Sequence, residues 1–374
     1  MKNFFHDKLI AVWAVTPEGA NLASLLSSRL ESVILKKPHV YLPAKLCIAE
    51  KNYPDNKKVI RFERLSHAVS EYFHEYQGHI FIMAAGIVVR MIAPSIRHKT
   101  VDPAVVVMDE AGRYAISLLS GHIGGANNLA GEISKIIGAV PIITTATDVN
   151  GVMAIDVMAM DKNLVIENPE AIKHVNMALI TKSKIMIHDP FDIMAEDFCD
   201  SQIFVKAFPD KTISDKTISD KTMPGIYIDH RTAELPEKTL VLRPKTLFAG
   251  IGCNRNTDKK EMRSLLSDVL ARNSLSPGSL AGLASIDLKS DEKGLIELGE
   301  ELDLPISFFE KDRLNSVKKI ETPSDTVEKY VGVKSVCEAA AILAAGNGRL
   351  IVPKQKTPNV TVAIAVKMSS ISWE

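Results

Sequence analysis

Apolar runs of strand length alternate with segments of helical periodicity over the first 148 residues of the chain. Strand-like runs stand at 9–15, 39–44, 79–85 and 140–147, and helix-like segments stand at 18–30 and 64–78. Strands that alternate with helices are typical of sheets covered by helices, so this pattern predicts an α/β layer fold. The stretch 105–120 predicts a β-hairpin, with EAGR as its turn.

The segment 245–374 repeats the alternation. Strand-like runs stand at 246–253, 283–289, 306–309, 349–354 and 359–366, and helix-like segments stand at 260–273, 290–303 and 335–346. The intervening residues are less regular and richer in methionine, and their polar repeat DKTISDKTISDKTM has no core-forming period. We therefore predict two α/β domains with mixed sheets, 1–148 and 245–374, joined by a less regular middle region, 149–244, which contains a repetitive linker at 210–223.

The charge balance argues against broad nucleic-acid binding. The chain has 374 residues, and its 45 basic residues equal its 45 acidic ones, whereas nucleic-acid binding usually shows a basic excess. Its four cysteines are scattered and form no C-x-x-C pair, which fits a reducing compartment and no metal site. The longest apolar run, 80–89, is about half as long as a bilayer crossing requires. We expect a cytoplasmic protein without membrane contact.

A glycine-rich loop is the first candidate site. The stretch LLSGHIGGANNLAGEI (118–133) joins a strand-like run to a helix-like run. Unpaired amides and the dipole at a helix start favour an anion or a developing oxyanion. We expect Gly121, Gly124 and Gly125 to let a ligand approach the backbone. Asn127 and Asn128 fall in the first turn, where one could cap the helix and the other could point at a ligand. The loop lacks both the Walker A lysine and a G-x-G-x-x-G fingerprint.

His122 in this loop is the candidate acid–base residue, because its unperturbed pKa lies near neutrality. The alternative is that it only bonds a loop carbonyl. Asp148 follows the next strand and could orient His122 or act as a base, or it could form an ordinary Asx-turn. Ligands gather at the carboxyl ends of strands in open α/β sheets. Thr144, Thr145 and Thr147 are therefore expected beside the glycine loop.

Two further patterns place charge in strand-like or apolar sequence. Arg90 interrupts the apolar run AAGIVVRMIAP, where an unpaired charge would be costly, so it pairs with an acid or meets an anionic ligand. Ser285, Asp287 and Lys289 alternate along a strand-like run and are predicted to share one strand face. The C-terminal segment also offers Cys253, Arg255, Glu338 and Lys354 as binding residues. Cys253 is not expected to be a nucleophile, because no partner histidine is evident nearby.

Taken in order, these motifs resemble the cobalt-precorrin-5A hydrolase family of anaerobic cobalamin biosynthesis. The resemblance rests on SGHIGGANNLAGEI with PIITTATD, and then on GIGCNRNT, ASIDLKSDE, GVKSVCEAAAILAAG, IVPKQK and VTVAIA. It covers about 80–150 and nearly all of 246–367. A shorter relative of the C-terminal segment exists in the aerobic pathway, which suggests that this segment handles corrinoids without the first domain.

The resemblance implies hydrolysis of the δ-lactone of cobalt-precorrin-5A with release of acetaldehyde, giving cobalt-precorrin-5B. The implied partner is a corrinoid, and since cobalt arrives in the substrate, no cofactor is expected. His122 and Asp148 are then the expected catalytic residues, and the other candidates bind substrate. The carboxylate anchors would be Arg90, Arg255, Lys289 and Lys354. A homodimer, or transient contact with neighbouring pathway enzymes, is left open.

Two other readings explain part of the pattern. A non-catalytic escort protein that holds a corrinoid intermediate would need the glycine loops and the basic anchors equally. It would not need His122 beside an anion cradle. A phosphate- or nucleotide-binding enzyme is the weaker alternative, because the Walker lysine is missing.

Overall fold

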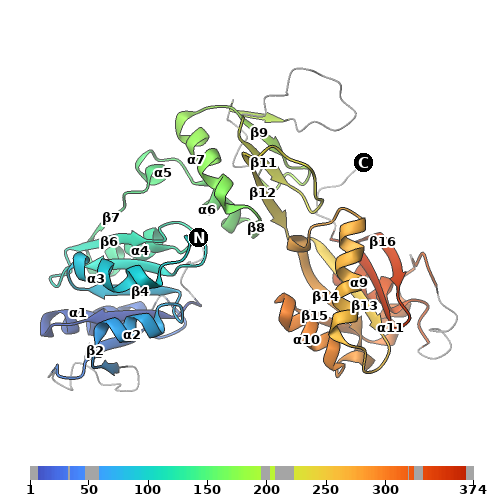
Figure 1. Cartoon of the computed structure of the whole chain (residues 1–374), viewed down its shortest axis with the longest axis horizontal. Coiled ribbons are helices and arrows are strands. Elements are labelled where there is room, and N and C mark those ends of the chain that lie inside the picture. Colours follow the sequence, from blue (N-terminus) through green and yellow to red (C-terminus); the bar gives the residue numbers. More distant parts are fainter. Residues whose placement is uncertain are drawn as a thin grey trace. The chain divides into compact units, whose positions relative to one another are not determined.

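Figure 1 shows a computed structural model of the chain, which describes residues 7–32, 34–46, 59–194, 203–206, 223–318, 320–323 and 332–367. The chain divides into two compact units, Met1–Met158 (unit 1) and Ala159–Glu374 (unit 2). Unit 1 contains one sheet and unit 2 contains two, each of them mixed and accompanied by helices. The predicted α/β class with mixed sheets is confirmed.

Unit 1 is built on a seven-stranded sheet with the order β3-β2-β1-β4-β5-β6-β7. Its strands are β1 (Ile10–Ala14), β2 (His39–Pro43), β3 (Val59–Phe62), β4 (Gly78–Ile82), β5 (Ala104–Met108), β6 (Tyr114–Leu119) and β7 (Val140–Ile142). Its helices include α1 (Pro17–Leu30), α2 (Leu65–Tyr72), α3 (Ala85–Ile92), α4 (Ala126–Ile137) and α5 (Ala146–Val149). The predicted hairpin is confirmed as the antiparallel pair β5 and β6.

Helices cover both faces of this sheet because its central strands are apolar on both sides. In β1, Ile10 and Val12 pack in one core cluster with residues of α1 and α4. Ala11 and Trp13 pack in a second cluster with residues of α2 and α3. Successive strand residues point to opposite faces, so a continuous apolar run predicts a strand that is buried on both sides.

The direction of β6 decides where the glycine-rich loop lies. β1 to β5 run parallel, β6 runs antiparallel to β5, and β7 runs parallel to β6. The carboxyl ends of β6 and β7 therefore lie at the edge where β4 and β5 begin. α3 starts after the carboxyl end of β4, at the opposite edge. The loop 120–125 and the residues after β7 thus share one sheet edge.

The middle region contains a sheet that the sequence did not predict. This five-stranded sheet has the order β10-β9-β11-β12-β8. Its strands are β8 (Leu164–Ile166), β9 (Ile185–His188), β10 (Phe204–Lys206), β11 (Gly225–Ile228) and β12 (Thr239–Pro244). The helix α6 (Ile155–Asp161) precedes β8 in the chain, and α7 (Ile172–Thr181) contacts β12. β9 to β12 are parallel, and β8 is antiparallel to β12. The predicted linker at 210–223 lies outside the described residues, apart from Met223.

The C-terminal sheet has the order β15-β14-β13-β17-β16. Its strands are β13 (Leu247–Cys253), β14 (Leu280–Ile286), β15 (Ile306–Phe309), β16 (Arg349–Lys356) and β17 (Val360–Val366), and its helices are α9 (Lys259–Arg272), α10 (Lys293–Leu302), α11 (Lys311–Asn315) and α13 (Val336–Ala344). α13 packs tightly on β13, since a Cβ added at Gly250 would lie 1.8 Å from the Cys337 carbonyl oxygen. The predicted final strand pair is confirmed.

Several predicted boundaries are wrong. The helix predicted over 64–78 ends at Tyr72, and Gly78 begins β4 instead of ending the helix. The strand predicted over 140–147 ends at Ile142, and Thr147 lies in α5. α10 begins at Lys293, so its first turn holds no acidic residue. In the described part of the chain, no helix has both the length and the apolar character to cross a membrane.

Candidate functional site

The glycine-rich loop folds back on itself before α4 begins. The backbone N–H of Ala126 donates to the Ser120 carbonyl, and that of Asn127 donates to the Gly121 carbonyl, both at 3.0 Å. These two amides therefore form hydrogen bonds within the loop. This is contrary to the expectation of free amides at the helix start that could bind an anion. Gly125 precedes α4 in the left-handed conformation, at φ 91°. A glycine suits this position because other residues pay a steric cost there.

Gly121 and Gly124 serve close internal packing. A Cβ added at Gly124 would lie 2.4 Å from the Ser120 Cβ. One added at Gly121 would lie 2.8 Å from Oδ1 of Asn127. Both distances are below any normal contact, so the glycines let the loop pack against its own side chains. We had expected them to give a ligand access to the backbone, and the structure offers this different reason for their presence.

His122 lies between two carboxylates. Its Nε2 is 3.0 Å from Oδ2 of Asp148, and its Nδ1 is 3.3 Å from Oδ2 of Asp156. Thr147 places its hydroxyl 3.1 Å from the same Nε2. The structure therefore brings together His122, Asp148 and Thr147 as the sequence suggested. The alternative, in which His122 only bonds a loop carbonyl, is not what the ring does.

The two carboxylates favour the protonated ring. The hydrogen bond to Asp156 raises the pKa of His122, burial of the ring opposes this shift, and the hydrogen bond to Asp148 adds to it. Burial opposes ionisation of Asp148 as well, but hydrogen bonds from Thr145 and His122 outweigh it, and the pKa of Asp148 lies below its ordinary value. An imidazolium held by two ionised carboxylates is the state that this geometry stabilises.

Asn127 holds Asp148 and its neighbour Thr145 in place through hydrogen bonds. Its Oδ1 accepts a 2.7 Å hydrogen bond from the Ser117 hydroxyl. Its Nδ2 donates to the Thr145 hydroxyl at 2.9 Å and to Asp148 Oδ2 at 3.1 Å. Thr145 in turn donates to Asp148 Oδ2 at 2.5 Å. Asn127 is buried and thus fixes Asp148 from behind.

Neither asparagine acts as the helix cap. Gly125 occupies the cap position of α4, and no side chain bonds the first turn there. Asn128 and Thr144 are exposed. The structure does not bring either of them into the His122 cluster.

Asp156 is the member of this cluster that sequence reasoning missed. It stands in the stretch MAIDVMAM, which we read only as methionine-rich middle sequence. Its carboxylate is only 6% exposed. An acid inside an apolar stretch is the signal that could have pointed to it, because a buried carboxylate needs a partner.

Arg90 does not have the setting that its sequence predicted. Its side chain is exposed on α3, so the apolar run around it imposes no burial cost. Its guanidinium donates a 3.4 Å hydrogen bond to the Gly86 carbonyl of its own helix. Among the described residues it has no acidic partner, so the first of the two alternatives, an ion pair, is wrong.

The candidates near the end of β14 make their contacts within the protein, and two basic ones lie against acidic side chains. Ser285 lies in β14 and donates a 2.7 Å hydrogen bond to the Ile251 carbonyl, whereas Asp287 and Lys289 lie in a 3₁₀ turn after the strand. The shared strand face was therefore a wrong prediction, because the strand ends at Ile286. Arg255 donates to Asp291 Oδ1 at 2.5 Å, and the Lys289 ammonium lies 3.5 Å from Glu292 Oε2. A ligand carboxylate would have to compete with these acids.

Glu338 and Lys354 form hydrogen bonds that join separate segments of the C-terminal part of the chain. Glu338 is fully buried and accepts hydrogen bonds from the backbone N–H groups of Glu321, Thr322 and Lys354 and from the Thr322 hydroxyl. The Lys354 ammonium donates to the Thr322 carbonyl at 2.7 Å. Glu338 therefore has no exposed atom to offer a substrate. Cys253 is partly buried, which raises the pKa of its thiol and disfavours the reactive thiolate.

Three family models together match most of the chain. They are described as cobalamin synthesis G N-terminal (67–148), cobalamin biosynthesis central region (153–244) and cobalamin synthesis G C-terminus (247–365). No group of three His, Cys, Asp or Glu side chains is arranged to hold a metal ion in the described part of the chain.

Individual proteins also match nearly the whole chain. The cobalt-precorrin-5A hydrolase of Priestia megaterium is 32% identical, over 95% of this chain and 94% of its own. That of Salmonella typhimurium is also 32% identical, over 97% of this chain and 99% of its own. A solved structure, a cobalamin biosynthesis protein G homologue from Sulfolobus solfataricus, is 23% identical over 98% of this chain and 99% of its own, with a TM-score of 0.36.

Proposed function

The chain belongs to the family of cobalt-precorrin-5A hydrolases, and from this premise we propose that it opens the δ-lactone of cobalt-precorrin-5A in anaerobic cobalamin biosynthesis. Opening is followed by release of acetaldehyde, and the product is cobalt-precorrin-5B. The observation that carries the site assignment is the His122 ring between Asp148 and Asp156, with 3.0 Å and 3.3 Å contacts.

Lactone opening needs a base for the attacking water and an acid for the leaving oxygen. The exposures of the two carboxylates separate their roles. Asp148 is 41% exposed and can meet a water molecule, whereas Asp156, at 6%, can only hold the ring. We assign the water proton to Asp148 and proton donation to the His122 imidazolium. His122 thus keeps only the acid part of the acid–base role that the sequence suggested, because its raised pKa favours the acid form.

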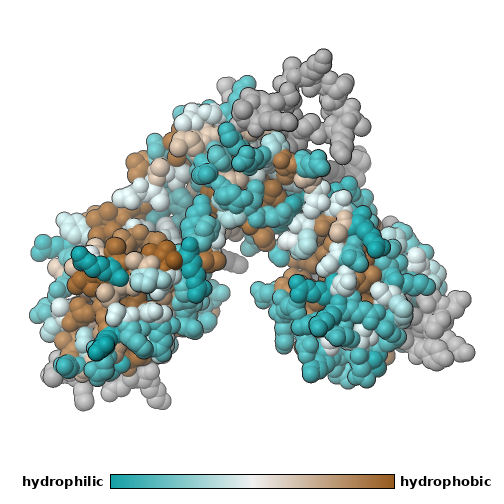
Figure 2. Space-filling model, viewed as in Figure 1, coloured by the Kyte–Doolittle hydropathy of each residue, from teal (hydrophilic) through white to brown (hydrophobic). Residues whose placement is uncertain are grey.

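The surface next to this cluster suits a large apolar ring. Val149 is 70% exposed and Met153 is 49% exposed, and they stand in the chain between the two carboxylates that hold His122. Figure 2 shows apolar patches on the visible face of unit 1. Contact with the flat face of a macrocycle would bury such side chains at a favourable free energy of about 25 cal/mol per Å².

The setting of the reaction follows from the same proposal. The corrinoid brings its own cobalt, so the steps assigned to His122 and Asp148 require no cofactor held by the protein. We place the reaction in the cytoplasm, since scattered cysteines fit a reducing compartment.

Anaerobic incubation of the purified chain with cobalt-precorrin-5A tests this function. We expect the corrinoid mass to rise by one water and then to fall by one acetaldehyde, which a dehydrogenase-coupled assay detects independently. His122→Gln, which keeps a polar side chain but cannot carry the imidazolium proton, should abolish the first change. A corrinoid that stays bound with its lactone intact would instead identify an escort protein.

A further inference from the structure

A basic turn lies at the sheet edge that carries the His122 cluster. This turn spans 96–102 and has the sequence IRHKTVD. β5 begins at Ala104, shortly after the turn, and β6 ends at Leu119, directly before the glycine-rich loop. The two strands are antiparallel, and Val105 is in register with Leu119. The residues before β5 therefore lie beside the residues after β6, so the basic turn and the loop with His122 are neighbours.

A close backbone approach joins the basic turn to the glycine-rich loop. A Cβ added at Gly124 would lie 3.2 Å from the Asp102 carbonyl oxygen. The glycine thus lets the turn and the loop pack directly on each other. His122 stands two residues before Gly124, and since consecutive Cα atoms are about 3.8 Å apart, its Cα lies within about 8 Å of the Gly124 Cα. The basic turn is therefore part of the immediate surroundings of the His122 ring.

A buried acid fixes the shape of the basic turn. Asp102 is only 4% exposed, and its two carboxylate oxygens accept the backbone N–H of Arg97 at 3.0 Å and 3.2 Å. The His98 carbonyl accepts the N–H groups of Val101 and Asp102 at 3.0 Å and 2.9 Å. These bonds use the backbone of Arg97 and leave its side chain out. The turn is thus held in place independently of the charged groups that it carries.

Two cations of the basic turn lack a partner. Arg97 and Lys99 are exposed, and among the described residues neither the guanidinium nor the ammonium group forms an ion pair or a hydrogen bond. The only acid of the turn, Asp102, accepts backbone N–H groups instead. His98 differs, because its Nδ1 lies 2.8 Å from the Thr100 hydroxyl oxygen. The turn therefore offers two unpaired positive charges, which attract anions to this edge.

Apolar side chains accompany these cations. On the basic turn, Val101 is 62% exposed and Ile96 is 43% exposed. Val149 and Met153, which flank the His122 cluster in the chain, are exposed as well. The edge thus combines apolar side chains with unpaired cations. A corrinoid combines an apolar macrocycle with carboxylates at its periphery, so the two surfaces are complementary in both respects.

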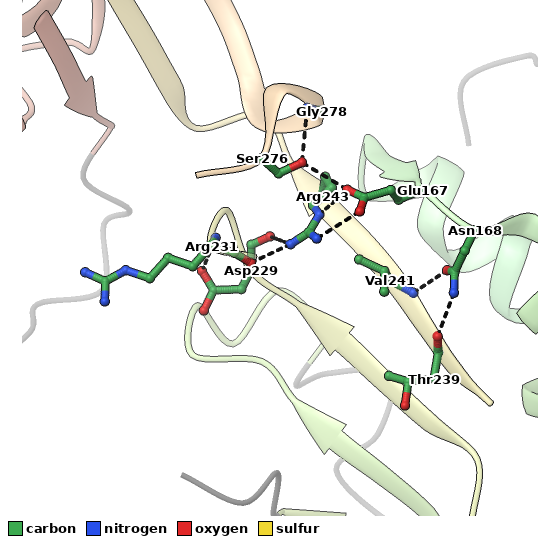
Figure 3. Close-up of polar contacts among 9 residues, drawn as sticks. All are labelled: Glu167, Asn168, Asp229, Arg231, Thr239, Val241, Arg243, Ser276 and Gly278. Carbon is green, nitrogen blue, oxygen red and sulfur yellow. Dashed lines mark hydrogen bonds and ion pairs between the residues drawn. The ribbon is translucent and has the colours of Figure 1, made fainter. Parts of the chain in front are cut away.

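A charged cluster in unit 2 shows the opposite arrangement. Figure 3 shows the guanidinium of Arg243 between Glu167 and Asp229. This arginine is buried and donates four hydrogen bonds, two to the Glu167 carboxylate and two to the carbonyl groups of Asp229 and Arg231. Its charge is balanced within the protein, and its hydrogen bonds fix the backbone. Arg243 therefore has a structural role, whereas the cations of the basic turn have none in the described contacts.

We propose that the basic turn binds the substrate at the His122 site, and that Arg97 and Lys99 hold peripheral carboxylates of the corrinoid. This inference rests on the proposed function, for which it names residues that orient the lactone. A guanidinium can bind a carboxylate through two parallel hydrogen bonds, and an ammonium binds it as a compact charge. Sequence reasoning missed both residues, because a run such as IRHKT reads as an ordinary solvated loop.

The proposed contacts should act on substrate binding and not on the chemical step. The peripheral carboxylates keep their charge while the lactone opens, so the turn binds the substrate and the transition state equally. Loss of such uniform binding raises KM and leaves kcat unchanged. A residue that took part in proton transfer would lower kcat instead.

The test uses the full-length chain with Arg97→Gln and Lys99→Gln combined. The backbone N–H that Asp102 accepts is retained, so the urea unfolding midpoint should not move. We expect KM for cobalt-precorrin-5A to rise about 10-fold with kcat unchanged, since each exposed ion pair contributes up to about 1 kcal/mol. Arg97→Lys keeps both charges and should keep KM near that of the unaltered chain. Arg113→Gln is the matched control, an exposed arginine in the turn between β5 and β6, at the opposite edge.

Equilibrium dialysis under anaerobic conditions measures binding without turnover. The probe is cobalt-precorrin-5A, followed by its absorbance, and the background is His122→Gln, in which the lactone is expected to stay intact. The double variant should raise Kd about 10-fold, as it raises KM. An increase in NaCl from about 0.05 M to about 0.5 M should weaken binding in the single-variant background more than in the double variant, because salt screens the two charges.

The outcomes are distinct. A KM and a Kd in the double variant equal to those in Arg113→Gln would overturn the proposal. A lowered kcat with KM and Kd unchanged would overturn it as well, since the turn would then act on the chemistry. An unaltered chain that binds the corrinoid but leaves the lactone closed would refute the proposed function alone, and the effect of the turn on Kd would still be measured on that chain.

Discussion

Oδ2 of Asp156 lies 3.3 Å from Nδ1 of His122, on the ring nitrogen that does not contact Asp148. Each nitrogen of the His122 ring therefore faces one carboxylate. In a pair with only one carboxylate, the ring could be neutral and present a basic nitrogen. With two, the proton on each nitrogen is stabilised, and the ring is best suited to donate.

Asp156→Asn tests whether the second carboxylate keeps the His122 ring protonated. Removal of the buried carboxylate takes away the largest cause of the raised pKa of His122, so that pKa should fall. Activity that requires the imidazolium then fails at a lower pH, and the alkaline limb of kcat should move toward acid. We expect kcat at neutral pH to fall about 100-fold.

The control for this variant is Asp161→Asn, at the exposed end of the same helix, α6. It should leave both the rate and the pH profile unchanged. An alkaline limb that stays in place in Asp156→Asn would mean that Asp156 does not set the charge of the ring.

The adjacent pair Asn127 and Asn128 gives a stability test. Asn127→Leu would leave the Ser117 hydroxyl, the Thr145 hydroxyl and the Asp148 carboxylate each short of one hydrogen bond. Hydrogen bonds contribute about 0.5–1.5 kcal/mol each, so urea unfolding of unit 1 should shift to lower denaturant. Asn128→Leu, on an exposed position, should change stability by less than about 0.5 kcal/mol. Equal effects of the two variants would contradict the buried role of Asn127.

Part of this site could be predicted from the sequence because it depends only on which residues directly follow two neighbouring strands. His122 follows β6 and Asp148 follows β7, and the ends of parallel neighbouring strands meet at one edge. Asp156 could not be found this way. Its approach to His122 depends on how the chain returns after α5, and no periodicity encodes that path.

The strand face predicted for Ser285, Asp287 and Lys289 was wrong for a different reason. A run such as SIDLKSD keeps strand-like alternation in its letters whether or not a partner strand is present. β14 stops at Ile286, where its pairing with β15 also ends. Beyond that point Asp287 and Lys289 enter a turn, and alternation no longer assigns faces. Arg255 is read as an anchor in the sequence, yet it pairs with Asp291 once the chain folds.

His79 gives unit 1 a dependence on pH. The Trp13 indole N–H donates to Nδ1 of His79 at 3.0 Å, and Nε2 lies 2.9 Å from the Phe73 carbonyl, so the neutral Nε2–H ring satisfies both partners. Burial lowers its pKa from 6.5 to about 4. Since the folded pKa lies below the unfolded one, stability is fully present above about pH 6.5 and is lost as the pH falls toward 4. The loss should reach about 3 kcal/mol.

Chemical unfolding at pH 7 and at pH 4 measures this term. His79→Leu should be less stable at pH 7, because the Trp13 N–H and the Phe73 carbonyl lose their partner, but its stability should change less with pH. His67→Leu, at an exposed position of α2, should keep the pH dependence of the unaltered chain. A His79→Leu variant that loses as much free energy between the two pH values as the unaltered chain would contradict this account.

Glu338→Gln separates a structural role from substrate binding. Oε1 of Glu338 accepts from the Thr322 hydroxyl and the Lys354 N–H, and Oε2 accepts from the N–H groups of Glu321 and Thr322. A glutamine offers one oxygen, and its NH₂ group would face at least one backbone N–H that cannot turn away. We expect unit 2 to lose about 3 kcal/mol of stability. Glu300→Gln, exposed on α10, should lose almost none. If Glu338 bound substrate instead, KM would rise while the unfolding curve stayed in place. The depth of burial makes the opposite result the expected one: a lowered midpoint of unfolding, with KM unchanged for the protein that remains folded.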